Sequence, residues 1–184
     1  MKVHPLILAL ATVILTVSTA SAQDARFNVG AGWMLPTGDY WNEPNVYHES
    51  QSAGAAWQLM GAVEVTIPRA PVGLRVDGMY GKIRRHGSFD VNGSTKLNGG
   101  TADLVYRIGA PMVPVRLYLL AGLGYYSVDL GLGSESNVGY NAGTGLSIGA
   151  GPTKVFVEGR YISVQTSGSA MNFFPVTAGL SFGL

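Results

Sequence analysis

Apolar residues recur at every second position through eight segments of the chain. A period of two is typical of β-strands with one apolar face, and glycine or proline interrupts every stretch that could otherwise form a helix. The chain has 26 glycines and only 12% charged residues, a composition unusual for a soluble helical domain. We therefore expect a single all-β domain with strands at residues 27–35, 57–67, 72–80, 102–108, 115–125, 140–148, 155–161 and 174–184.

The links between these segments alternate in length. Membrane barrels combine long extracellular loops with short periplasmic turns, and a closed barrel leaves no backbone edge unpaired in lipid. The pattern predicts an eight-stranded antiparallel up-and-down transmembrane β-barrel. Its longer links would be residues 36–56, 84–95, 131–137 and 165–172, and its short ones residues 68–71, 110–114 and 150–153.

The amino-terminal segment has a different pattern. Lys2 and His4 precede an apolar run, and Ala20-Ser21-Ala22 supplies the small residues at which a signal peptidase cleaves. The run, residues 6–17, is shorter than the roughly 20 residues of a transmembrane helix. We expect a signal peptide over residues 1–22, cleaved after Ala22, and an exported barrel domain over residues 23–184.

The alternate face of the expected strands is polar. A lipocalin-like soluble barrel would turn its apolar residues inward, whereas a membrane barrel turns them toward lipid and encloses the polar set. Glycines at inner positions would make room for Tyr118, Tyr126 and Phe156 in a narrow lumen. We expect a lumen charge network of zero net charge, formed by Glu64, Arg75, Asp77, Asp103, Arg107, Arg116, Glu158 and Arg160.

One ion pair follows from the expected register. If the turn at residues 68–71 places Ile67 opposite Val72, then Glu64 lies opposite Arg75 on the inner face. Pairing would offset the cost of burying either charge. On this hypothesis, exchanging the two residues preserves stability better than removing Arg75 alone.

Aromatic residues gather at the ends of the segments. Trp and Tyr do the same where a barrel crosses the membrane interfaces. Those toward the longer links are Trp33, Trp57, Tyr80, Tyr125, Tyr140, Tyr161 and Phe174, and those toward the short links are Phe27, Tyr106 and Phe182.

Three cations occupy outward positions beyond the aromatic residues that lie toward the longer links, namely Lys82, Arg84 and Lys96. The phosphates of lipopolysaccharide lie at that height of an outer membrane. The three cations are therefore candidate lipopolysaccharide contacts through charge-assisted hydrogen bonds. Solubility of the loops is an equally good explanation of the same residues.

On these features the chain resembles the OmpA/OmpX/OmpW-like family of small outer-membrane barrels, over residues 26–184. The last segment, residues 174–184, is similar to the final strand by which such proteins are recognised for insertion, although the family usually ends in an aromatic residue and this chain ends in Leu184. The resemblance implies an outer-membrane location, contact with lipid and lipopolysaccharide, and insertion by the barrel-assembly machinery.

Motifs for catalysis and metal binding are weak. G-x-S-x-G occurs at residues 145–149 and 179–183, but within expected strands and without a histidine later in the chain. His86-Gly87-Ser88 resembles the H-x-S pair of outer-membrane lipid A deacylases, but no acidic partner is fixed by spacing. His48-Glu49 fits no recognised metal spacing, and the absence of cysteine excludes thiolate sites. We expect no catalytic residue, cofactor or metal.

The charge balance of 12 basic and 11 acidic residues gives no reason to expect nucleic acid binding. We expect a non-enzymatic integral outer-membrane protein with a structural or surface-interaction role, a lumen filled by side chains, and binding by the loops, especially residues 36–56. The sequence does not identify the surface ligand. Two alternatives stay open: a narrow small-solute channel, and a lipid A-modifying hydrolase that would use Ser88.

Overall fold

The structure, a computed structural model, describes residues 25–37, 52–53, 56–86, 94–109, 114–129, 134–149, 151–166 and 170–183. The expected signal peptide, Leu184 and most of the first long link lie outside these ranges. Within them the chain forms strands β1 (Ala25–Thr37), β2 (Ser52–Ala53), β3 (Ala56–Thr66), β4 (Val72–His86), β5 (Ser94–Ile108), β6 (Val115–Asp129), β7 (Ser134–Ile148), β8 (Thr153–Val164) and β9 (Met171–Gly183).

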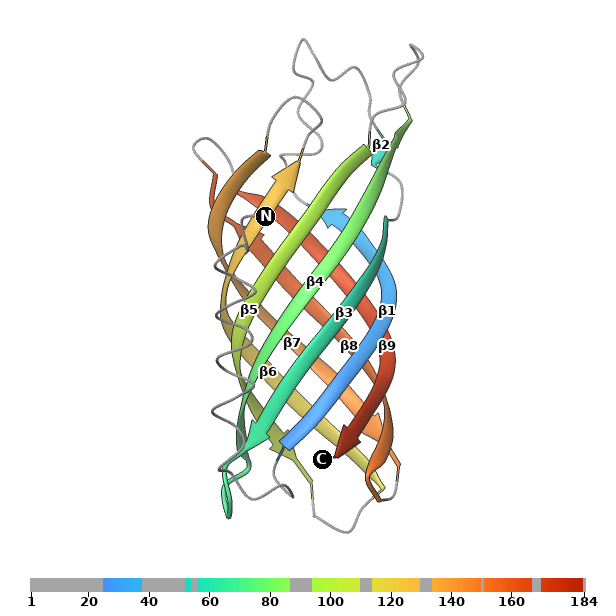
Figure 1. The fold of residues 1–184 in the computed structure, drawn as a ribbon, viewed down its shortest axis with the longest axis vertical. Helices are drawn as coiled ribbons and strands as arrows, with labels where there is room; N and C mark the ends of the chain where they lie inside the picture. Colours follow the sequence, from blue (N-terminus) through green and yellow to red (C-terminus); the bar gives the residue numbers. More distant parts are fainter. Residues whose placement is uncertain are drawn as a thin grey trace, which may run out of the picture.

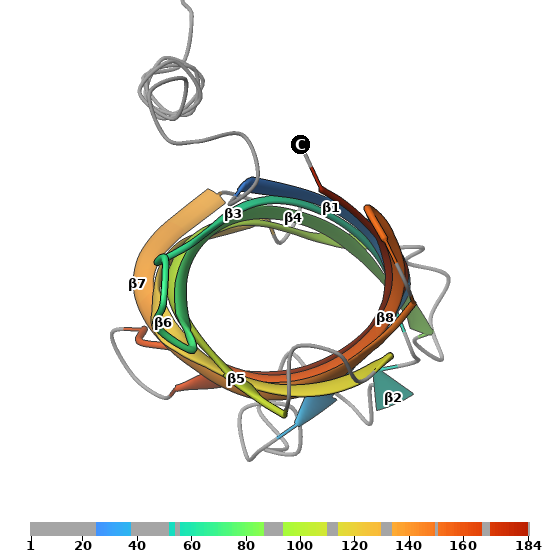
Figure 2. The ribbon, with the colours of Figure 1, turned by 90° about the horizontal axis from the view of Figure 1, so that it is seen from below.

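The eight long strands form a closed ring of antiparallel pairs. Each pairs with its neighbour along the chain, β1 also pairs with β9, and the β4–β5 pairing completes the circle. The short strand β2 pairs with the end of β4. Figure 1 shows the strands tilted around a common axis, and Figure 2 shows them encircling it. The predicted eight-stranded antiparallel barrel is confirmed.

The turn between β3 and β4 sets the register that the sequence predicted. Ile67 donates its backbone N–H to the carbonyl of Val72 over 2.9 Å, and Arg69 takes a left-handed conformation with φ of 67°. Glu64 consequently lies opposite Arg75. The tight turn lies at what we call the short-turn end of the barrel, where β3 ends and β4 begins; the opposite end is the long-link end.

Several strands extend further toward the long-link end than the apolar pattern indicated. β4 continues to His86 and β5 begins at Ser94, so the link between them is shorter than the expected residues 84–95. The expectation of a long link at residues 131–137 is wrong, because β6 and β7 leave only residues 130–133 between them. The polar residues here still pair in the sheet, and the Oγ atoms of Ser127 and Ser134 lie 2.8 Å apart in a hydrogen bond.

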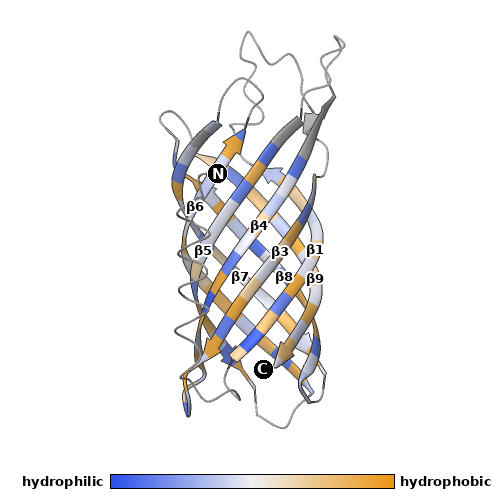
Figure 3. Ribbon diagram, in the orientation of Figure 1, coloured by the Kyte–Doolittle hydropathy of each residue, from blue (hydrophilic) through white to orange (hydrophobic). Residues whose placement is uncertain are grey.

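The two faces of the wall differ as predicted. Outward residues are apolar and exposed, with Trp33 at 66%, Leu123 at 65% and Leu104 at 57%. Inward polar residues are buried, and hydrophobic and hydrophilic residues alternate along the strands in Figure 3. The rings of Trp57 and Tyr80, on neighbouring strands, have centroids 5.5 Å apart at the long-link end of this apolar surface.

Glycines on the inner face make room for large side chains, as the sequence indicated. A Cβ atom on Gly145 would overlap the ring of Tyr118, its register partner on β6. Gly124 and Gly139 similarly lie against the ring of Tyr126, which is fully buried. The lumen is therefore packed with side chains that the missing Cβ atoms admit.

Candidate functional site: the lumen of the barrel

The middle of the lumen is held by Arg75 and its partners. Arg75 donates from Nε and Nη2 to Oε2 of Glu64, each over 3.1 Å, and from Nη1 to Oε2 of Glu158 over 2.5 Å. The hydroxyl of Tyr118 donates to the same Glu158 oxygen over 2.8 Å. The guanidinium also lies over the Tyr118 ring, 5.3 Å from its centroid. The predicted Glu64–Arg75 pair is thus formed, as part of a larger cluster.

Arg160 extends this cluster toward the long-link end of the lumen. Both of its Nη atoms donate to Oδ2 of Asp77 over 2.9 Å, and Nη2 donates to Oε1 of Glu158 over 2.7 Å. Asp103 accepts from Arg160 Nη1 over 3.2 Å and from the amide of Asn141 over 2.8 Å. Glu158 therefore joins the two arginines into one network.

This network is costly to disrupt because its members are removed from water. Glu158 is 2% exposed, Asp103 1% and Arg75 4%. Removing one partner of a buried ion pair leaves an uncompensated charge, at a cost of about 3–5 kcal/mol. The structure thus brings together seven of the eight expected network residues through ion pairs, namely Glu64, Arg75, Asp77, Asp103, Arg107, Glu158 and Arg160.

The long-link end of the lumen is apolar, which the alternation of apolar and polar residues did not predict. Phe173, Tyr126, Met34, Leu97 and Ile162 have no exposed surface. We call the whole buried cluster the apolar plug; its other members are Ala56, Met79, Val128, Val164 and Met171. In this part of the barrel the inner positions are apolar, while outer positions on β4 and β5 include Lys82 and Lys96, so the pattern of apolar residues outside and polar residues inside does not hold there.

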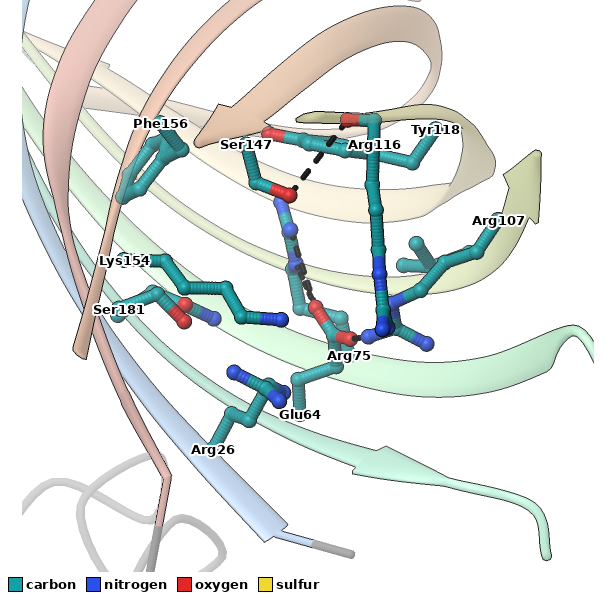
Figure 4. A pocket seen from close by; sticks show the side chains of 12 residues that line it. Arg26, Glu64, Arg75, Arg107, Arg116, Tyr118, Ser147, Lys154, Phe156 and Ser181 are labelled. Atoms are coloured by element: carbon teal, nitrogen blue, oxygen red, sulfur yellow. Dashed lines mark hydrogen bonds and ion pairs between the residues drawn. The ribbon is translucent and has the colours of Figure 1, made fainter. Parts of the chain in front are cut away.

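The short-turn end of the lumen is rich in cations. Arg26, Arg107, Arg116 and Lys154 come from four strands and line one cavity with Glu64, and their side chains extend toward the same space in Figure 4. We call this region the cationic mouth. Arg116 was expected within the charge network, but the structure places it here.

The expectation of a lumen with zero net charge is wrong. Arg26 and Lys154 also face inward, because each lies two residues from a buried inner residue, Asn28 or Phe156, on its strand. The described lumen therefore contains six cations and four carboxylates. Continuing the two-residue period by one step in β1 and β8 would have found both.

The predicted lipopolysaccharide contacts lie on the outer face at the long-link end. Lys82 and Lys96 face each other across the β4–β5 pair, and Trp57 lies opposite Lys82 on the other side. Lys96 is exposed, and Asp129 is its register partner on β6. Arg84 is the register partner of Ser94, and its side chain is not among those that the structure describes.

The motifs set aside at the sequence level lie in or next to strands. Both G-x-S-x-G stretches lie in or directly after β7 and β9, and the hydroxyl of Ser147 contacts the backbone carbonyl of Arg116. His86 ends β4, while Ser88 and His48-Glu49 lie outside the described residues. In the described ranges no group of three or more His, Asp or Glu is arranged to hold a metal ion.

No helix among the described residues is long and apolar enough to cross a membrane.

Comparison with known proteins finds similarity in fold alone. No protein-family model matches the chain, and no curated protein matches it in sequence. The crystal structure of Neisserial surface protein A (NspA) is similar at a TM-score of 0.62 and 18% identity, covering 89% of this chain and 98% of that one. The N-terminal β-barrel domain of OprF from Pseudomonas aeruginosa is similar at 0.50 and 18%, covering 87% and 98%. The fold is that of small eight-stranded outer-membrane barrels, as the sequence resemblance implied.

Proposed function

We propose that the protein is a non-enzymatic integral protein of the outer membrane, with a closed lumen and a structural or surface-directed role. The observation that carries this proposal is the polarity of the wall. Large apolar side chains such as Leu104 and Leu123 are exposed, whereas ionised side chains such as Glu158 are buried inside. A continuous exposed apolar belt is unfavourable in water and favourable in lipid, and a closed ring of strands satisfies its backbone without water.

The outer membrane is the location that best suits this architecture. Barrels of outer-membrane type have an even number of antiparallel strands, beginning at eight, with short periplasmic turns. The short-turn end would then face the periplasm and the long-link end the outside. A surface-directed role draws support from the similarity to NspA, which is named as a surface protein.

Cysteine labelling tests the orientation of the wall, since the chain has no cysteine of its own. Leu104→Cys on the outer face and Ser147→Cys in the cationic mouth form the pair of variants. In lipid vesicles we expect a fluorophore at residue 104 to be quenched by a quencher attached to the lipid chains. We expect residue 147 to react with a small, negatively charged, water-soluble thiol reagent. The reverse pattern would refute the proposal.

We also propose that Lys82, Arg84 and Lys96 bind the phosphates of lipopolysaccharide. Support comes from the register, which places Lys82 and Lys96 side by side next to Trp57 at the long-link end of the apolar belt. Two adjacent like charges repel each other, so an anion between them relieves the repulsion.

The test compares lipopolysaccharide that co-purifies with the wild type and with a variant carrying Lys82→Gln, Arg84→Gln and Lys96→Gln. We expect a several-fold loss. The matched control is Arg69→Asn, which removes an exposed cation at the opposite end and suits the left-handed backbone there. Heat-modifiable gel migration confirms that each variant folds, and equal lipopolysaccharide in both would contradict the assignment.

A further inference from the structure

We propose that the cationic mouth binds a phosphate group that carries two negative charges. This inference goes beyond the function proposed above, and the binding site itself does not depend on it. Arg26, Arg107, Arg116 and Lys154 converge on one cavity from β1, β5, β6 and β8.

The charge around the cavity calls for an anion. Among the described residues that line it, Glu64 is the one carboxylate, and Arg75 and Arg107 already share it. The described part of the lumen has six cations and four carboxylates, and the excess lies at this end. A ligand with two negative charges would balance that excess.

Buried hydrogen-bond donors point to the same conclusion. Nη1 of Arg26, Nη1 of Arg107 and Nδ2 of Asn28 are shielded from solvent and have no acceptor within the described part of the chain. Asn28 is only 3% exposed, and all three residues line the cavity. Buried donors without an acceptor are unfavourable, so these three favour a ligand rich in acceptor oxygens.

The size of the cavity restricts the ligand. Its volume is about 30 Å³, and one water needs about 10–15 Å³ on the same measure, so it admits two or three oxygen-sized atoms. A phosphate group fits with part of its oxygens inside and its remaining substituent directed out of the mouth. A carboxylate would bring only one negative charge. Among oxyanions of this size that carry two charges, we assign the site to free phosphate or to the terminal phosphate of a phosphomonoester.

Calorimetric titration of the folded full-length barrel in a maltoside detergent, which has no phosphate, tests the proposal. Inorganic phosphate is titrated into the protein, and chloride is titrated separately at the same ionic strength for comparison. We expect saturable binding at one site, weakened about tenfold or more by Arg26→Gln combined with Lys154→Gln, because each removes a charge-assisted contact. Lys154→Arg, which keeps the charge, should retain binding.

The control is Arg69→Asn, since Arg69 is an exposed cation at the same end and does not line the cavity. It should bind phosphate as the wild type does. The proposal is overturned if the wild type binds no more phosphate than chloride, or if the Arg26 and Lys154 double variant, shown folded by gel migration, binds equally well. The cysteine labelling of the barrel wall can give its expected result whether or not phosphate binds. A failure of the phosphate site is therefore distinguishable from a failure of the proposed membrane function.

A competition experiment identifies the source of the phosphate. Phosphatidic acid in mixed micelles presents a phosphomonoester on a lipid, and phosphatidylcholine, a zwitterionic phosphodiester without net charge, serves as its comparison. If phosphatidic acid displaces inorganic phosphate and phosphatidylcholine does not, the site is assigned to a lipid headgroup. If neither lipid displaces inorganic phosphate, the site is assigned to free phosphate. Either result supports the proposed chemistry.

Discussion

At the scale of single residues, Glu158 is the carboxylate that joins the two buried arginines of the lumen. It accepts hydrogen bonds from Arg75, Arg160 and Tyr118, and each arginine has a second carboxylate partner. The network therefore distributes each charge over several partners. The stability of the network therefore depends on residues such as Glu158, which contact two arginines at once, more than on any single ion pair.

Replacement of Glu158 tests this arrangement. We expect Glu158→Gln to lower the free energy of unfolding by about 3 kcal/mol, the lower end for a broken buried pair, because Arg75 keeps one carboxylate partner and Arg160 keeps two. Denaturant unfolding in lipid vesicles, followed by tryptophan fluorescence, measures the loss. Asp129→Asn removes a carboxylate that is partly exposed at the end of β6, and should change stability by no more than about 1 kcal/mol. Equal losses would contradict the bridging role.

The network also changes what is expected of the Glu64–Arg75 pair. The sequence suggested that exchanging the two residues would preserve the interaction. In the structure, a glutamate at position 75 would face Glu158, and an arginine at position 64 would face Arg107. The exchange is therefore expected to be destabilising, and a poor test of a pair that the structure itself contains.

At the scale of strands, the two-residue period correctly predicted which face of the barrel wall is apolar and the register between β3 and β4. It missed the ends of the strands, because polar residues such as Ser127 and Ser134 continue to pair beyond the apolar belt. It missed the apolar plug because residues such as Met34 and Phe173 lie on an inner face that becomes as apolar as the outer one. Periodicity detects a contrast between faces, and around Met34 on β1 and Phe173 on β9 there is none.

Paired glycine substitutions test how neighbouring strands fit together. Gly145→Ala on β7 should destabilise the barrel by about 1–3 kcal/mol, because the new Cβ atom would overlap the ring of Tyr118 on β6. Gly61→Ala on β3 is the matched control, since a Cβ atom there meets nothing within 4 Å. The same unfolding measurement applies to both. Equal tolerance of the two changes would show that Tyr118 does not need the space above Gly145.

At the scale of the whole molecule, the lumen is divided along its axis into three layers. The apolar plug occupies the long-link end, the ion-pair network the middle, and the cationic mouth the short-turn end. The first two layers are filled by side chains that are almost completely buried. A continuous aqueous path is therefore not expected, which weighs against the channel alternative.

Planar-bilayer recording tests this conclusion. We expect the purified barrel to insert without producing stepwise conductance, because ions would have to pass fully buried Phe173 and Ile162 in addition to the paired charges. A general porin reconstituted in the same way provides the positive control. Reproducible steps from the wild type would favour the small-solute channel instead.

The pairing of the first strand with the last has a consequence for how the chain can be cut and rejoined. Arg26 lies opposite Gly183, at the end where the other connections are tight turns. A few added residues could join the two ends there, and a new start and finish could be opened between Ile67 and Val72. Such a circularly permuted chain would keep every strand pair of the ring, so the folded barrel does not require β1 to be the first strand of the chain.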